Sequence, residues 1–424
     1  MRRRGFNGAV RRRGQAARRT GGPGASERRT GAARHFRPAA APATSAPRAA
    51  LDGGVILSAT LLVSLGVVMV YSTTAPLAIG RTLPPYFMRH LFVTALAFMI
   101  TALALRVPLA VWRRVALPLW GLSVLLLFAT LVVGDSANGA QRWLRVPHVG
   151  LAFQPVEIAK WATLLVVASA LAPLSERAMA GWQPVRTALL FSVPTIIPLL
   201  LQPDFGNALV LVALVGLLLF CAGIPLRFLV APAALSVAGA ALYVTLRPYA
   251  LARVRGFLDP WRYSQAEGFQ LVQSFVAFGR GELLGVGLGD GRQKLFYLPE
   301  AHTDFILSVV AEELGLAGVL VVLGAFAAFI VAGTRIARRA RDPFALLTAF
   351  GMTALIALPA IVNAAVVMGL APTKGFTLPF LSYGGNSLLV CALAVGILLR
   401  LGSCEAAPET RRIGAATSRS GAGG

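Results

Sequence analysis

The chain of 424 residues contains only three cysteines and few charged side chains. Cys221 and Cys391 fall within apolar runs, and Cys404 follows the last of these runs. This spacing excludes a disulfide framework and a cysteine-ligated metal site, so we assign the thiols to packing. Charged residues make up 13% of the chain and hydrophobic residues 56%, with a mean hydropathy of +0.71. This balance excludes an ordinary soluble domain and indicates an integral membrane protein.

Apolar runs of about 20 residues can cross roughly 30 Å of hydrocarbon, and this chain has ten candidates. They lie near residues 53–72, 86–105, 112–133, 155–174, 184–201, 207–223, 227–246, 305–334, 344–369 and 380–400. Prolines interrupt the fifth and seventh runs, which is tolerated where neighbouring helices satisfy the freed carbonyls. We therefore predict an all-α, polytopic membrane domain of about ten transmembrane helices over residues 51–402. A large extracytoplasmic loop, 247–304, precedes the eighth helix.

Arginine placement predicts the orientation of the chain, because cytoplasmic segments carry an excess of Lys and Arg. Residues 1–50 contain thirteen arginines and a single acidic residue, Glu27. We predict a disordered cytoplasmic tail here, suited to anionic membrane lipid, and a second short cytoplasmic tail over 403–424. No nucleic acid is expected as a partner, since no nucleic-acid-binding fold accompanies the arginines. The loop 247–304 is also basic, which an anionic ligand would explain, although long loops escape the charge rule.

Asp304 stands at the junction between this polar loop and the eighth apolar run. Two interpretations fit it: a general base whose pKa is raised by burial, or a cap on the helix that follows. Glu312 and Glu313 lie further along the same run, and at least one should face protein because charges inside a membrane are costly. Asp204 lies between the fifth and sixth runs. We favour a helix cap over a catalytic acid as its role.

Several polar residues near the fourth run are candidates for a substrate cavity. Glu157 and Lys160 are three residues apart and share a helix face, as either a structural ion pair or part of the cavity. Arg142 precedes Trp143 and could pair a cation with an aromatic residue at the membrane interface. The glycine-rich stretch 279–291 lacks the strand and helix of a dinucleotide site, so we expect its glycines to allow tight turns and close backbone approach to the membrane surface or a ligand.

Five motifs occur in one order along residues 53–400: NGAQRWL, FQPVEIAKWA, LLQPDFGNALVL, the stretch 273–315 and PTKGFTLPFLSYGGNSL. Together they closely resemble the SEDS family (shape, elongation, division and sporulation), and its division branch in particular. The resemblance implies a multi-pass enzyme of the bacterial cell membrane at the division septum. It would polymerise lipid II into glycan strands, with a class B penicillin-binding protein transpeptidase and other division-complex membrane proteins as partners.

The same resemblance implies that Asp304 is the essential acid, and we predict it as the catalytic base. We also predict five substrate-binding residues, which would contact the diphosphate or contribute to the electrostatic potential of the cavity. They are Arg142, Glu157, Lys160, Lys294 and Lys374. No cofactor is certain: a divalent cation, Mg²⁺ or Mn²⁺, suits diphosphate chemistry, but no ligand cluster in the sequence requires one. Two alternatives are a lipid II flippase, which also suits intramembrane charges and broken helices, and a non-enzymatic division scaffold.

Overall fold

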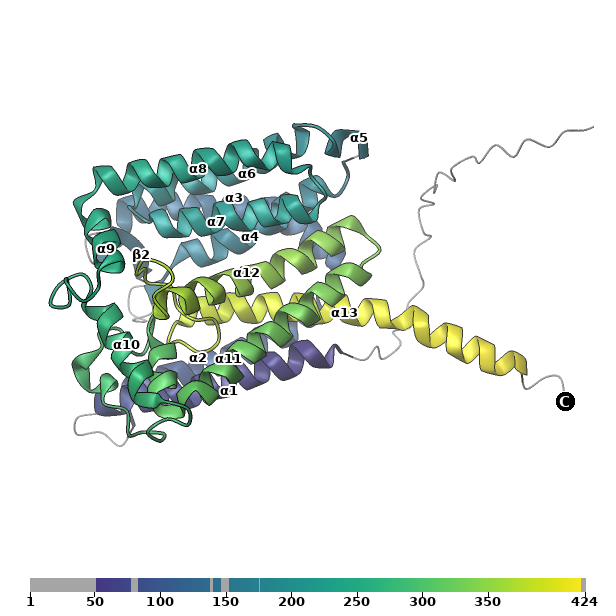
Figure 1. Ribbon diagram of the computed structural model, residues 1–424. Helices are drawn as coiled ribbons and strands as arrows, with labels where there is room; N and C mark the ends of the chain where they lie inside the picture. The colour runs from purple at the N-terminus through teal and green to yellow at the C-terminus, as the bar shows by residue number, and fades with distance from the viewer. Residues whose placement is uncertain (1–50, 78–82, 138–139, 146–151, 175, 421–424) are drawn as a thin grey trace, which may run out of the picture. The chain divides into compact units, whose positions relative to one another are not determined.

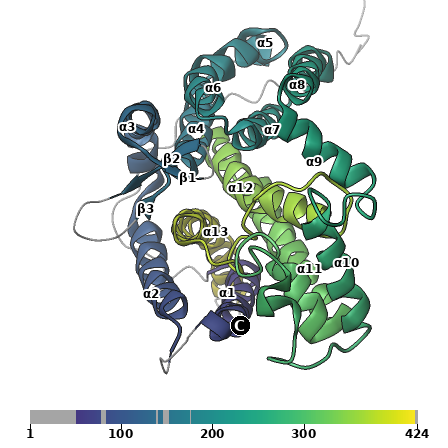
Figure 2. The same cartoon turned by 90° about the vertical axis from the view of Figure 1, so that its left-hand side faces the viewer.

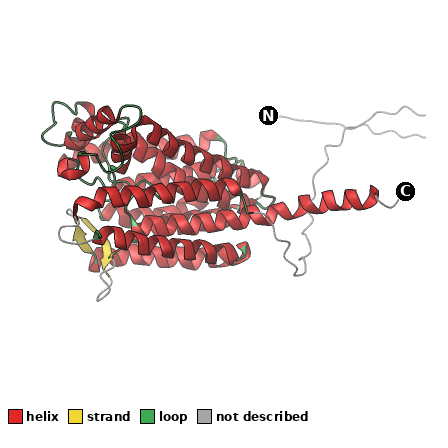
Figure 3. Cartoon of the chain, turned by 90° about the horizontal axis from the view of Figure 1, so that it is seen from below, coloured by secondary structure: helices red, strands yellow, loops and turns green. Residues whose placement is uncertain are grey.

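The computed structural model describes residues 51–77, 83–137, 140–145, 152–174 and 176–420. The predicted arginine-rich tail, residues 1–50, lies outside the described residues. Within the described ranges nearly all regular structure is helical, and three short strands lie together at one end of the helix bundle (Figure 3). This confirms the predicted all-α class.

Each of the ten predicted apolar runs forms a helix. The helices are α1 (Gly53–Thr74), α2 (Pro85–Arg106), α3 (Leu109–Val133), α4 (Pro155–Leu171), α6 (Gln183–Leu201), α7 (Phe205–Cys221), α8 (Leu226–Leu246), α11 (Ile306–Arg339), α12 (Pro343–Val367) and α13 (Gly385–Ser420). In the part of the chain that the structure describes, eight helices are long and apolar enough to cross a membrane, while α4 and α7 have 17 residues each. The chain is therefore a polytopic membrane protein.

Local sequence explains where these helices begin. Proline occupies one of the first two positions of α2, α4, α6 and α12, where its missing N–H costs no hydrogen bond. Aspartate caps three helices, one of which is α12 again: the side chains of Asp52, Asp204 and Asp342 accept hydrogen bonds from backbone N–H groups in the first turns of α1, α7 and α12. The predicted capping role of Asp204 is thereby confirmed.

Helix α11 is broken at Gly315, which has a φ of +66° and a ψ of −165°. The backbone groups around the break pair with the glycine-rich stretch: Val286 N–H donates to Glu312 O at 3.0 Å, and Leu316 N–H donates to Glu282 O at 3.0 Å. A Cβ at Gly285 would overlap the backbone of α11. The close backbone approach is thus made to α11 and not, as predicted, to the membrane surface or a ligand, because the stretch satisfies polar groups that lipid could not.

The helices pack into a bundle in which α13 lies against α2, α11 against α12 and α1, and α3 against α4 (Figures 1 and 2). Helix α8 lies at the edge of the bundle beside α7 and has no buried residue. Its exposed side chains include Val230, Leu235, Val237 and Leu242. Apolar residues on such an outer face are suited to contact with lipid tails.

One end of the bundle, on the left in Figure 1, carries the strands and the longest segments that connect the helices. We call it the loop end. The antiparallel strands β1 (Asp135–Ala137), β2 (Ala140–Arg145) and β3 (Ala152–Phe153) lie here, in the order β1-β2-β3 with Asp135 opposite Trp143 and Leu144 opposite Phe153. The predicted loop 247–304 contains α9 (Pro248–Leu258), α10 (Phe269–Gly281) and a short π-helical turn (Gln293–Tyr297). A 3₁₀ turn (Ala75–Leu77) ends α1 at the loop end, and at the other end α5 (Glu176–Met179) joins α4 to α6.

Candidate functional site

Asp304 lies in a tight turn directly before α11. Glu300 opens the turn with a φ of +57°, and its carbonyl accepts hydrogen bonds from the N–H groups of Thr303 and Phe305 at 3.1 and 3.3 Å. Phe305 is the N-cap of α11, and no side chain caps this helix. The interpretation of Asp304 as a capping residue is therefore wrong. Instead, its carbonyl accepts a hydrogen bond from Asn363 of α12 at 2.7 Å, and its half-buried carboxyl group lines a cavity.

The surroundings of Asp304 raise its pKa to about 7, from an ordinary value of 3.8. Burial is the largest cause, because the ionised form loses hydration. The negative charge of Glu300 adds to the increase, while the guanidinium group of Arg253 opposes it. A carboxyl group with a pKa near neutrality can accept a proton and release it again, which is what general base catalysis requires.

Two predicted cations meet at a second carboxylate in the same cavity. Lys374 Nζ lies 3.6 Å from Oδ1 of Asp204, and Arg142 Nε lies 4.0 Å from Oδ2. Arg142, on β2, is fixed by donating a hydrogen bond to the carbonyl of Pro203 at 2.6 Å. Gly206 allows the lysine to pass, since a Cβ there would overlap the Lys374 side chain.

The surroundings of Lys374 change the pKa of its ammonium group. Burial lowers its pKa below the ordinary 10.5, the negative charge of Asp204 opposes the decrease, and the nearby charge of Arg142 adds to it. Asp204 therefore has two roles. Its side chain caps α7, and its carboxylate positions the Arg142 and Lys374 side chains, which have further N–H groups that can donate to an anion. The sequence predicted only the first of these roles.

Arg253 of α9 is a third cation of the cavity. Its guanidinium donates to the carbonyl of Thr373 at 2.9 Å and lies 5.0 Å from the ring centre of Tyr249. The sequence showed it only as one of several basic residues in a loop whose charge suggested an anionic ligand. Its contact with the segment that carries Lys374 joins residues far apart in the chain, so sequence spacing could not single it out.

Glu157 and Lys160 form the predicted ion pair on α4, with Lys160 Nζ 2.7 Å from Glu157 Oε1. The ammonium group also donates to Asn207 Oδ1 of α7 at 3.2 Å. Glu157 and Asn207 line the cavity, whereas Lys160 is buried behind them and does not. Its position supports the structural interpretation of the pair, with Glu157 as the member that faces the cavity.

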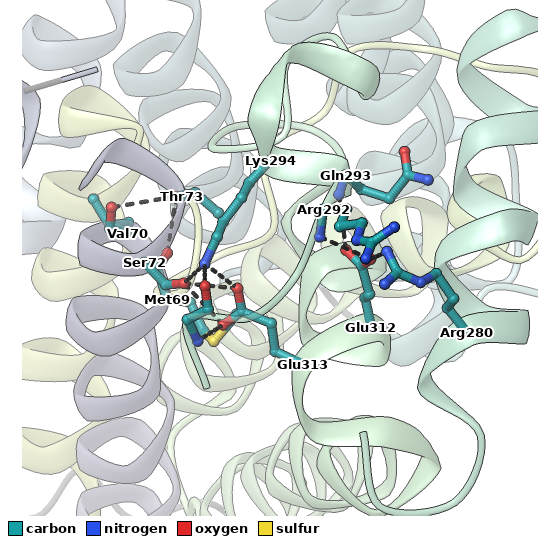
Figure 4. A network of polar contacts seen from close by, with 11 residues as sticks. Met69, Val70, Ser72, Thr73, Arg280, Arg292, Gln293, Lys294, Glu312 and Glu313 are labelled. Atoms are coloured by element: carbon teal, nitrogen blue, oxygen red, sulfur yellow. Dashed lines mark hydrogen bonds and ion pairs between the residues drawn. The ribbon is translucent and has the colours of Figure 1, made fainter. Parts of the chain in front are cut away.

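Lys294 lies in a different polar cluster, shown in Figure 4. Its ammonium group contacts Oε1 of Glu313 at 2.6 Å and donates to Ser72 Oγ at 2.8 Å and to Gly289 O at 2.6 Å. It does not line the cavity of Asp304. The position of Lys294 therefore gives no support to its predicted role in that cavity, since its donors are used to fasten the 282–294 segment to α1 and α11.

Glu312 and Glu313 are both fully buried, so both face protein, as was expected of at least one. Glu312 pairs with Arg280 at 2.9 Å and accepts hydrogen bonds from the backbone N–H groups of Arg292 and Gln293 at 2.9 and 3.0 Å (Figure 4). The two carboxylates thus hold the loop before the π-helical turn against the broken helix α11. Full pairing of this kind offsets the cost of burying charge.

The cavity itself has a volume of about 1700 Å³ at the loop end. Four of the six predicted site residues line it, namely Arg142, Glu157, Asp304 and Lys374. Its wall also includes parts of α2, α7, α8, α9 and the start of α13. Among the described residues, no three His, Cys, Asp or Glu side chains are grouped so as to hold a metal ion.

Sequence comparison places the chain among known proteins. A family model for cell cycle proteins of the FtsW, RodA and SpoVE type matches residues 54–406. A probable peptidoglycan glycosyltransferase FtsW from Trichlorobacter lovleyi is 42% identical over 354 residues, which cover 82% of this chain and 92% of the relative. A protein of the same name from Halomonas elongata is 39% identical over 376 residues, covering 87% and 94% of the two chains.

Solved structures agree with the sequence comparison. A chain from a structure described as the structural coordination of polymerization and crosslinking by a peptidoglycan synthase complex superimposes with a TM-score of 0.70 at 31% identity, covering 84% of this chain and 98% of that one. The rod shape determining protein RodA of Thermus thermophilus superimposes with a TM-score of 0.62 at 28% identity and the same coverage. The chain therefore belongs to the FtsW, RodA and SpoVE family, which is the SEDS family that its motifs resemble.

Proposed function

We propose that this protein is a peptidoglycan glycosyltransferase that polymerises lipid II into glycan strands during septal wall synthesis. The observation that carries the proposal is the position of Asp304, a carboxyl group of raised pKa, in one cavity with the cations Arg142, Arg253 and Lys374. The relatives named as probable peptidoglycan glycosyltransferases cover most of this chain, which supports the same reaction here.

The reaction needs a base and a means of stabilising the leaving group. A sugar hydroxyl of one substrate attacks the anomeric carbon of the other, and Asp304 accepts the proton of that hydroxyl. The bond between the anomeric carbon and the diphosphate breaks, and the departing lipid diphosphate keeps the electron pair. Arg142, Arg253 and Lys374 provide positive charge where the leaving group becomes more negative.

The location and the partners follow from the same proposal. Positive charge on the last turn of α11, at Arg338 and Arg339, and on the loop that follows it, at Arg341, favours a cytoplasmic position for that end of the bundle. The loop end would then face outward, with both chain termini in the cytoplasm. A class B penicillin-binding protein would crosslink the glycan at the septum, and the structural similarity to a chain of a peptidoglycan synthase complex supports such a partner.

The test is polymerisation of labelled lipid II by the purified protein together with its cognate class B transpeptidase and division-complex activators. Products are resolved on a gel for the wild type and for Asp304→Ala and Asp304→Asn. We expect a ladder of glycan strands from the wild type and none from either variant, with folding checked by thermal unfolding. An unchanged ladder in the variants would remove Asp304 from catalysis. Movement of lipid II across vesicles without any glycan product would favour a flippase instead.

A further inference from the structure

Three aromatic side chains gather at the border of the cavity near Asp304. Tyr86 comes from the first turn of α2, His302 from the turn before Asp304, and Tyr383 from the segment before α13. Their ring centres are 5.5 Å apart for Tyr86 and Tyr383, 5.7 Å for Tyr86 and His302, and 5.8 Å for His302 and Tyr383. We call these three residues the aromatic cluster. All three line the cavity, and 46% of Tyr86 is exposed.

The backbone fixes this cluster relative to Asp304. The N–H of Tyr383 donates to the carbonyl of His302 at 2.9 Å, and Ser382 Oγ donates to the carbonyl of Thr303 at 2.5 Å. His302 therefore lies on the turn that ends at the proposed base, and Tyr383 is hydrogen-bonded to that turn. Rigid placement of this kind is what a site needs to align a reacting group.

A buried histidine beneath the cluster has an unused polar atom. His90 of α2 is 2% exposed and its ring centre lies 6.2 Å from that of Tyr383. It lines the same cavity, and its Nε2 has no hydrogen-bond partner among the described residues. Because buried polar atoms are nearly always paired, this nitrogen points to a polar ligand beside the rings.

Two groups of cavity residues near Asp304 differ in chemistry. In the first, the 373–374 segment brings together Lys374 and the contact of Arg253 with Thr373, so this group is suited to a diphosphate. The second group consists of the aromatic cluster and His90, with Arg89 as a single cation beside Tyr383. A pyranose ring has an apolar C–H face and a rim of hydroxyl groups, which matches flat aromatic surfaces accompanied by a few polar atoms.

We propose that the aromatic cluster of Tyr86, His302 and Tyr383 binds the pyranose ring of the acceptor sugar, the one whose hydroxyl Asp304 deprotonates. This inference rests on the proposed glycosyl transfer and deepens it, because it assigns the two substrates to two different groups of residues near the base. The oxygen of the acceptor hydroxyl forms the new bond to the anomeric carbon of the donor, and its proton passes to Asp304. The donor diphosphate leaves with its electron pair toward Arg253 and Lys374.

The test separates acceptor from donor in the purified complex with the class B transpeptidase. A lipid II analogue without the attacking hydroxyl serves only as donor, and a soluble disaccharide without a diphosphate serves only as acceptor. We expect Tyr86→Ala and Tyr383→Ala to raise the KM for the acceptor about tenfold, the factor produced by about 1.4 kcal/mol of lost binding. The KM for the donor should not change. Tyr86→Phe and Tyr383→Phe keep the rings and should raise the acceptor KM less than the corresponding alanine variants do.

Tyr71→Ala is the matched control, because Tyr71 packs edge-on against Phe87 of α2 at 5.0 Å and does not line the cavity. An unchanged acceptor KM in both folded alanine variants, or an increase in the donor KM instead, would overturn the inference. Saturation-transfer NMR of the disaccharide on the complex gives a readout that needs no turnover. If the wild type made no product, the proposed function would fail, while loss or retention of the NMR signal in the alanine variants would still decide for or against the sugar site.

Discussion

The carboxylate of Asp304 lies directly against Gly375, where a Cβ atom would stand only 2.6 Å from Oδ2. Gly375 follows Lys374 in the chain, and the carbonyl of its other neighbour, Phe376, accepts a hydrogen bond from Asn363 at 2.6 Å. The same Asn363 amide also holds the carbonyl of Asp304. One side chain of α12 thus connects the proposed base to the segment that carries the proposed leaving-group cation, and the missing side chain at 375 allows them to meet.

Gly375→Ala should therefore reduce polymerisation while the protein stays folded. The added methyl group must displace the Asp304 carboxylate, and a misplacement of about 1 Å can cost roughly 100-fold in rate. The rate of glycan formation in the reconstituted complex measures the effect. Gly121→Ala in α3 is the control, because a Cβ there meets nothing within 4 Å. A Gly375→Ala enzyme with the rate of the wild type would show that the contact does not set the position of the base.

The pH dependence of polymerisation should report the ionisation of Asp304. A base must be ionised to accept a proton, so the rate should increase as the pH rises through about 7, the pKa of this carboxyl group. It should decrease again at high pH, when Lys374 loses its proton below the ordinary value of 10.5. Initial rates over this pH range, in the complex at saturating lipid II, provide the measurement.

Two variants assign the acidic limb to Asp304. Glu300→Gln removes a negative charge that raises the pKa of Asp304, so the midpoint should move to lower pH. Arg253→Gln removes a positive charge that lowers it, so the midpoint should move to higher pH. Midpoints that stay fixed in both variants, or that move in the same direction, would show that another group controls this limb.

The ion pair between Lys294 and Glu313 should contribute to stability rather than to chemistry. The side chains are only 5% and 0% exposed, and removing one partner leaves the other charge buried. Lys294→Met should lower the free energy of unfolding by about 3–5 kcal/mol, and the double variant Lys294→Met with Glu313→Gln should recover much of the loss. Denaturant titration in detergent measures both.

An exposed ion pair gives the comparison for that series. Arg145 and Asp135 lie 2.8 Å apart with 69% and 48% of their side chains exposed, and Arg145→Ala should cost less than about 1 kcal/mol. If Lys294→Met is no more damaging than Arg145→Ala, the buried cluster does not fasten the loop to α11. If folded Lys294→Met lost polymerisation, Lys294 would instead contribute to substrate binding or catalysis.

Much of the helical architecture could be predicted because apolar runs report membrane spans directly. The break in α11 at Gly315 could not, because its freed backbone groups are satisfied by residues 282–287, a tertiary pairing that leaves no local signal. The last predicted span started near residue 380, whereas α13 begins at Gly385. The glycine pair at 384–385 therefore lies at the start of that helix.

The candidate site shows the same division between local and tertiary information. Motifs singled out Asp304, Arg142, Glu157 and Lys374, and the fold brings them to one cavity. The motifs could not show that the ammonium group of Lys294 contacts Glu313. A lysine in a motif does not reveal whether its side chain contacts substrate or a buried carboxylate. The aromatic cluster was missed for a related reason: its members come from α2, the turn before α11 and the segment before α13.

Arg142 and Lys374 should act as a coupled pair, because both contact the carboxylate of Asp204. Arg142→Ala and Lys374→Ala should each lower kcat/KM for lipid II about 100-fold or more, the usual cost of losing one group that stabilises developing charge. The double variant should lose less than the product of the two single effects, since neighbours that share a partner are not additive. Arg186→Ala, which removes an exposed cation of α6 that does not line the cavity, serves as the control. Strict additivity in the double-mutant cycle would mean that the two cations bind separate parts of the substrate, and unchanged kcat/KM in both single variants would remove them from the leaving-group site.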